Sequence, residues 1–171
     1  SDLNSLNTAL PDSLNLLGEI INHSVFNDKQ RMKVLIKSLR ANAESMLVNQ
    51  GNTLAINRTL SYLSSGGKYK DLNIIPYYNF ICDLDDNFEL RFDEMTTNLN
   101  DVSNIVFNKK GLVVSYTGDK VNYEKFIYTF NKFKETINDK KFNKQIYKFD
   151  FSSKNEAFVI PSQVQYVVKA G

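Results

Sequence analysis

The sequence predicts an α/β (α+β) protein that is predominantly helical, with a long helical hairpin and a small, incomplete sheet. Apolar residues recur at spacings of three and four through most of the chain up to Ile137, which is typical of amphipathic helices. Two stretches, Gly111–Thr117 and Ala157–Lys169, have the β-branched or alternating pattern of strands. Because two strands do not make a stable sheet by themselves, we expect the sheet to be incomplete.

The central element is an amphipathic helix predicted for Asn27–Val48. Its apolar face consists of Met32, Leu35, Ile36, Leu39, Ala43, Met46 and Leu47. Its polar face carries Lys33, Lys37, Arg40 and Glu44. We therefore expect Leu39 to be buried at the middle of the helix. Gly51 is predicted to end the helix in a left-handed conformation.

Further helices are predicted from capping and stop signals. They run from Pro11 to His23 or Ser24, from Asn52 or Thr53 to a stop at Ser65-Gly66-Gly67, from Pro76 over the short, almost wholly apolar and buried stretch YYNFICDL, from Asp86 to about Asn104, and over Val121–Ile137. The last of them has an aromatic face that includes Phe126 and Phe133. The alternating stretch at the end of the chain is expected to fray after Pro161, or to bury Gln163–Val168 against a second copy or a non-native surface.

Composition argues against several kinds of partner and location for this protein. The net charge of +2 over 171 residues does not favour nucleic acid or an anionic membrane as a partner. No apolar run approaches the length of a membrane span, and the first residues lack the pattern of a signal peptide. Cys82 is the single cysteine, so no internal disulfide can form. We expect a cytoplasmic protein, or one in an organelle lumen if eukaryotic.

Metal sites have weak support in the sequence. His23 is the single histidine, and a zinc site made with Cys82 would need carboxylates for its other ligands. A calcium-loop spacing is formed by Asp83, Asp85, Asn87 and Glu94. Phe88 occupies the position where such a loop needs glycine, so a helix start explains these residues better. No metal ligand and no cofactor is predicted within this chain.

Other motifs are equally incomplete. Ser65-Gly66-Gly67-Lys68 lacks the first glycine and the final Ser or Thr of a phosphate loop. Basic and aromatic residues interleave in one stretch: Lys140, Lys141, Lys144 and Lys148 with Phe142, Tyr147, Phe149 and Phe151. Such a pattern can bind single-stranded nucleic acid, but inward-pointing aromatic residues of a loop or edge segment explain it as well. No serine has a His–Asp partner set, so no catalytic residue is predicted.

Three stretches together resemble a known family. They are Arg31–Leu63, Ile74–Phe88 with the sequence IIPYYNFICDLDDNF, and Asn155–Gly171 with the sequence NEAFVIPSQVQYVVKAG. In this order and spacing they are similar to the presequence-protease subfamily of the pitrilysin/insulinase zinc metallopeptidases. The resemblance implies a longer parent whose two halves enclose a chamber in which peptides are cut. Zinc would be held elsewhere in that parent by an inverted His-x-x-Glu-His motif.

The resemblance also implies how this chain is divided. Residues 1–11 stay undecided, residues 12–155 would be the latter part of the third domain, and residues 156–171 would be the first strand of the following domain. Because the chain has one histidine and lacks the zinc motif, no catalytic or metal-binding role transfers to it. The implied role is chamber wall and scaffold, with the remaining domains of the parent as partners and peptides as its substrates. The alternative is a free-standing helical protein-interaction module.

Overall fold

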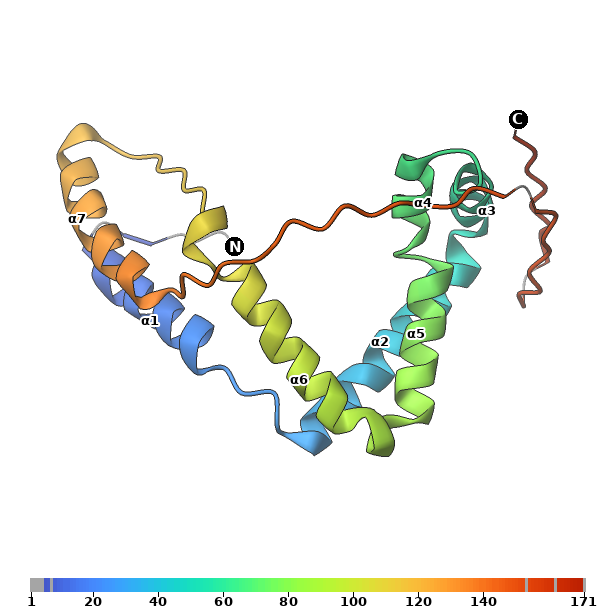
Figure 1. Cartoon of the computed structure of the whole chain (residues 1–171), viewed down its shortest axis with the longest axis horizontal. Coiled ribbons are helices and arrows are strands. Elements are labelled where there is room, and N and C mark those ends of the chain that lie inside the picture. Colours follow the sequence, from blue (N-terminus) through green and yellow to red (C-terminus); the bar gives the residue numbers. More distant parts are fainter. Residues whose placement is uncertain (1–4, 7, 153, 162, 171) are drawn as a thin grey trace. The chain divides into compact units, whose positions relative to one another are not determined.

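The structure is a computed structural model that describes residues 5, 6, 8–152, 154–161 and 163–170, and its regular elements there are all helices (Figure 1). In chain order they are α1 (Leu10–His23), α2 (Lys29–Asn49), α3 (Gly51–Leu60), α4 (Ser65–Asp71), α5 (Ile75–Asp86), α6 (Phe88–Val106), a 3-10 helix η1 (Lys109–Gly111) and α7 (Lys120–Thr136). The predicted α/β class is therefore wrong, and the described residues form an all-α structure. None of these helices is long and apolar enough to cross a membrane.

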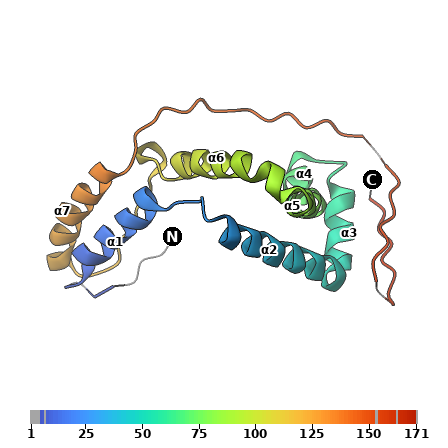
Figure 2. The same ribbon diagram turned by 90° about the horizontal axis from the view of Figure 1, so that it is seen from below.

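The chain divides into two compact units, each made of two separate stretches. Unit 1 consists of Ser1–Asn27 and Asp93–Lys144, and unit 2 consists of Asp28–Phe92 and Gln145–Gly171. Helices α1 and α7 pair in unit 1, whereas in unit 2 α2 pairs with α5 and α3 with α4 (Figure 2). The division of the parent that the resemblance implies, with a boundary after residue 155, stays a prediction.

The core of unit 1 lies between α1 and α7. Leu14, Phe133 and Ile137 are buried there, and Leu10, Leu17, Ile21 and Phe130 pack around them. The predicted aromatic face of α7 is confirmed at Phe126 and Phe133, which are each 8% exposed. Asp119 caps this helix, because its side chain accepts a hydrogen bond from the backbone N–H of Asn122 at 2.9 Å.

Two asparagines join the chain after α6 to the chain after α7. The Asn108 side-chain amide donates to Asn138 Oδ1 and to the Lys140 carbonyl, both at 2.9 Å. The Asn138 side-chain amide in turn donates to the carbonyl oxygens of Asn104 and Phe107. Asn108 is only 6% exposed, so these bonds satisfy an amide that would be costly to bury alone. An isolated parallel bridge between Asn108 and Asn138 is the only β-type pairing among the described residues.

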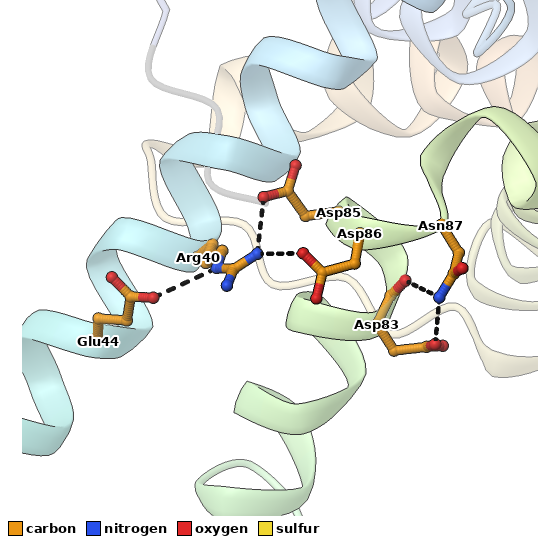
Figure 3. Close-up of polar contacts among 6 residues, drawn as sticks. All are labelled: Arg40, Glu44, Asp83, Asp85, Asp86 and Asn87. Atoms are coloured by element: carbon orange, nitrogen blue, oxygen red, sulfur yellow. Dashed lines mark hydrogen bonds and ion pairs between the residues drawn. The ribbon is translucent and has the colours of Figure 1, made fainter.

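Unit 2 buries α2 against α5. The buried apolar residues here are Ile36 and Ala43 of α2 and Ile81 and Leu84 of α5. The predicted apolar face of α2 is therefore rotated from the observed one, since Leu39 is 42% exposed and Leu35 47% exposed. Arg40, predicted for the polar face, lies between the two helices instead (Figure 3). The expectation that Leu39 is buried is wrong.

Glycines predicted to end helices have different roles in unit 2. No described glycine has a positive φ, and Gly51 begins α3 instead of capping α2 in a left-handed conformation. Ser65-Gly66-Gly67 forms the first turn of α4, a helix absent from the prediction. Ser64 caps α4, and a Cβ on Gly67 would lie 2.2 Å from the carbonyl oxygen of Leu60. Gly67 therefore lets two backbone segments approach closely.

Neither predicted strand is present in the described residues. Residues 112–117 of the stretch Gly111–Thr117 are irregular, and Val113 within them is 92% exposed. Ala157–Lys169 has no regular strand in its described part either. A β-branched or alternating pattern favours an extended conformation, but a strand also needs a hydrogen-bonded neighbour. The described residues supply no such neighbour, so the local pattern alone predicted a sheet that does not form.

Candidate functional site: two arginine centres in unit 2

Arg40 is the centre of a charged network between α2 and α5 (Figure 3). Its Nη1 donates to Asp86 Oδ1 at 2.7 Å and to Asp85 Oδ2 at 3.1 Å, and its Nε donates to Glu44 Oε1 at 3.3 Å. These carboxylates, Asp86 foremost, raise the pKa of the Arg40 guanidinium above its ordinary value. The network fixes the pairing of two helices, and a permanently charged arginine in it is suited to structure more than to proton transfer.

The residues of the predicted calcium template are held by other partners. Asp83 accepts a hydrogen bond from the Asn87 side chain at 2.8 Å, and Asp85 pairs with Arg40 (Figure 3). Asp83 also pairs with Arg91. Asp83 and Asp85 both belong to α5, so no twelve-residue loop is formed from them. Glu94 lies in the continuous helix α6. These residues accordingly belong to helices and not to a cation loop, but Asp86, predicted to begin the next helix, is the last residue of α5 and pairs with Arg40.

Arg58 is the second centre and is more deeply enclosed. Its Nη1 donates to Asp71 Oδ2 at 2.6 Å, and Asp71 is fully buried. Asp71 Oδ1 accepts no hydrogen bond within the described part of the chain. A buried carboxylate of this kind depends on its one cationic neighbour, because an uncompensated buried charge is strongly destabilising. Arg58 thus stabilises the packing of α3 on α4.

The other edge of the same guanidinium binds a carboxylate from far along the chain. Arg58 Nε and Nη2 donate to the two oxygens of Glu156 at 2.7 Å and 3.1 Å, which is the bidentate geometry of the strongest charge-assisted pairs. The Tyr62 hydroxyl donates to the same carboxylate. Arg58, helped by Tyr62, lowers the pKa of Glu156 to about 2. Burial and the bond to Glu156 raise the pKa of Tyr62.

Aromatic rings complete this second centre. The guanidinium carbon of Arg58 lies 5.3 Å from the centroid of the Tyr62 ring and 5.9 Å from that of Phe158. Both distances are within the range of cation–π attraction. At the start of the same helix α3, a Cβ on Gly51 would lie 2.7 Å from the ring of Tyr166 and 3.5 Å from Ile160. The absence of a side chain at Gly51 therefore makes room for the terminal segment.

The remaining candidates from the sequence do not form a cluster. His23 pairs with Glu19 of its own helix at 2.8 Å in unit 1, and Cys82 is a half-buried free thiol in unit 2. No group of three or more potential metal ligands is present among the described residues. Ser65 to Lys68 belong to the first turns of α4, which is only seven residues long. Nothing in this arrangement resembles a phosphate loop.

The basic and aromatic stretch after α7 is irregular and largely exposed. Its exposed aromatic side chains include Phe142 at 47%, Tyr147 at 75% and Phe151 at 47%, whereas Phe149 is half-buried. The expectation that these aromatic residues point inward is therefore wrong for most of them. The lysines between them are exposed as well.

The sequence interpretation missed both arginine centres. Arg58 and Tyr62 are four residues apart, which places them on one face of a helical stretch. That spacing could have indicated a local pair. Nothing local connects them to Asp71 or Glu156, because the latter lies 98 residues from Arg58. Arg40 was placed on the solvent side because a charged residue between apolar helices is the less common arrangement.

The chain is similar to parts of much longer proteins. Residues 2–84 match the family of regions associated with M16 peptidases of subgroup C. Protein HypA from Clostridium perfringens (strain 13 / Type A) is 29% identical over 168 residues, covering 98% of this chain and 17% of that protein. Presequence protease 1, chloroplastic/mitochondrial, from Arabidopsis thaliana is 25% identical over 162 residues, covering 94% of this chain and 15% of that protein.

The curated relatives that the chain matches are thus far longer than the chain, which spans about one sixth of their length. The matched family and the presequence protease agree with each other, and both agree with the resemblance found in Arg31–Leu63, Ile74–Phe88 and Asn155–Gly171. Residues 2–84 of this chain are thus similar to the associated region of M16-family peptidases.

Proposed function

We propose that this chain is a non-catalytic part of a larger zinc metallopeptidase, in which it forms wall and scaffold of a closed, two-half chamber where peptides are degraded. The observation that carries the proposal is the match of residues 2–84 to a peptidase-associated family. The zinc, its ligands and the catalytic base would be supplied by other domains of the parent. Cytoplasm, or an organelle lumen in a eukaryote, is the proposed compartment.

The exposed apolar surface of α2 supports a scaffold role. Val34, Leu35 and Leu39 are 66%, 47% and 42% exposed, although each is a large aliphatic residue. Contiguous apolar surface on a helix typically marks a contact with another chain or domain. In the proposed parent, this surface would be covered by the domains that lie outside the present chain. By the resemblance, residues 156–171 would in addition continue into the following domain of the parent.

A comparison of one variant in two contexts tests the proposal. The double substitution Leu35→Asn and Leu39→Asn should destabilise the present chain by only about 1–3 kcal/mol, because both side chains are already half exposed, and it should destabilise the full-length protein more. In the full-length protein encoded by the natural reading frame, the same change should lower the melting temperature by several degrees and reduce peptide hydrolysis. Lys37→Asn is the matched control, since Lys37 is also exposed on α2.

Two outcomes would contradict the proposal. One is a full-length protein that tolerates the double substitution as well as the isolated chain does, which would mean that this face of α2 contacts nothing. The other is a natural reading frame no longer than the present chain. A chain of that length would favour the free-standing interaction module instead.

A further inference from the structure

The terminal segment of the chain packs against helix α3 through several of its side chains. We call residues 156–161 and 163–166 the strap. Glu156 reaches Arg58, Phe158 faces the same guanidinium, and Ile160 and Tyr166 lie against Gly51. Glu156, Phe158 and Ile160 lie at alternate positions, which share one side of an extended chain, whereas Tyr166 lies beyond the bends at Pro161 and Gln163. The odd-numbered Val159 is fully exposed, at 101%.

The docking surface for the strap carboxylate belongs to the helices. The buried Asp71 of α4 holds Nη1 of Arg58, and this leaves the Nε and Nη2 edge of the guanidinium to bind a carboxylate. Such a fork matches the two oxygens of a carboxylate in a fixed plane. Tyr62 adds a hydroxyl donor to the same carboxylate. Because Asp71 and Tyr62 are not part of the strap, the socket they form with Arg58 does not require the strap for its assembly.

The surface of α3 at Gly51 is also shaped to receive the strap. A Cβ at Gly51 would come within 2.8 Å of two carbon atoms of the Tyr166 ring, closer than non-bonded carbon atoms approach. Gly51 lies at the start of α3, where glycine is not a favoured helix former. Because Gly51 has no side chain, the Tyr166 ring can lie directly against the backbone of α3, which gives the strap a second contact with the helices.

We propose that Arg58 is the receptor of a carboxylate latch, in which Glu156 fastens the strap to α3 and α4 and can detach to leave an open carboxylate-binding socket. The latch stands whether or not the longer protein is a peptidase. The ligand class is a carboxylate carried on an extended peptide, and the strap is its intramolecular occupant. Release of the strap exposes Arg58 without exposing Asp71, which stays paired with it.

The first arm of the test measures order along the strap by ¹⁵N relaxation in the intact chain. In the wild type, the amide order parameters of residues 157–160 and 163–166 should be about 0.85, the value of a rigid backbone. Glu156→Gln keeps the shape and removes the charge, and the order parameters should fall below about 0.6. Asp150→Asn, at an exposed carboxylate in the same terminal segment, should leave them unchanged.

Proteolysis independently measures the equilibrium between the docked and the detached strap. Chymotrypsin cleaves after Phe158 and Tyr166 only when the strap has left the helices, so the cleavage rate follows the detached population. Glu156→Gln should raise that rate about 10-fold to 100-fold, the range expected for loss of a charge-assisted pair. A wild-type strap that is already mobile, or a Glu156→Gln strap as ordered as the wild type, would overturn the latch.

The second arm tests the open socket with a peptide. A synthetic peptide with the sequence of residues 154–169 is titrated by NMR into the Glu156→Gln chain. It should bind at least about 10-fold more tightly than the same peptide carrying Glu156→Gln, because only a carboxylate pairs with both nitrogen atoms of Arg58. The wild-type chain should bind it more weakly, since its own strap competes at high effective concentration. Equal binding of the two peptides, or no binding of either, would contradict a carboxylate-specific socket.

Discussion

The packing face of α2 can be tested with two substitutions one turn apart. Ile36 is 3% exposed and Leu39 is 42% exposed, and the two side chains contain the same number of carbon atoms. Replacing either with alanine removes three carbon atoms. Any difference in stability between the two variants therefore reports the surroundings of the side chain and not its size.

The expected magnitudes differ because one site is enclosed and the other is open. For Ile36→Ala, the lost transfer free energy is about 2.4 kcal/mol at about 0.8 kcal/mol per carbon. The cavity left against α5 adds to this, so the total should lie within about 2–5 kcal/mol. For Leu39→Ala, about half of the transfer term applies and no enclosed cavity forms, which gives about 1.2 kcal/mol. Alanine favours the helix by only a few tenths of a kcal/mol over either residue.

Urea unfolding followed by far-UV circular dichroism measures both values. Ile36 and Leu39 lie in the same helix and the same unit, so their effects appear in the same transition even if the two units unfold separately. Equal destabilisation by the two variants, or a larger effect of Leu39→Ala, would refute the observed face of α2. It would restore the face predicted from the sequence.

Further predictions concern the Arg58 centre and its surroundings. Arg58→Ala should destabilise unit 2 by about 3–5 kcal/mol in urea unfolding, because Asp71 would be buried without a cation, and adding Asp71→Leu should recover much of the loss. Gly51→Ala should release the strap by forcing Tyr166 outward, and faster chymotrypsin cleavage would report this, whereas Gly66→Ala meets open space and should not. Arg58 lowers the pKa of the Glu156 carboxylate from 4.5 to about 2 in the folded state. The contribution of Glu156 to stability should therefore be complete above about pH 4.5 and be lost as the pH falls toward 2. An NMR titration midpoint near 4.5 would contradict this.

Local signals predicted most of the helices correctly. The helix begun by Pro11 is α1, the helix after Pro76 is α5, and Val121–Ile137 matches α7 to within one residue at each end. In each case a proline or a capping residue fixes the start, and apolar residues of period 3.6 continue it. Capping residues and apolar periodicity lie within the helix or next to it, so a single sequence suffices to find such a helix.

The errors arose where the outcome depends on residues far away. On α2, the buried face is the one that lets Arg40 pair with Asp85 and Asp86 of α5, and these partners lie more than 40 residues away in the sequence. The strand predictions failed because alternation in Ala157–Lys169 does not reveal what its inner side will contact. In the structure that side meets Arg58 and Gly51 and not another strand. The candidate site was missed for the same reason.

The central claim is that this chain is a non-catalytic part of a larger zinc peptidase. Zinc content and peptide hydrolysis, measured side by side for this chain and for the full-length protein of its natural reading frame, test it most directly. After dialysis against a weak chelator, the full-length protein should retain about one zinc ion per chain and hydrolyse an unfolded peptide, as a three-ligand catalytic site would. The present chain should do neither. Stoichiometric zinc and peptide hydrolysis in the present chain alone, or a full-length protein that lacks both, would contradict the account.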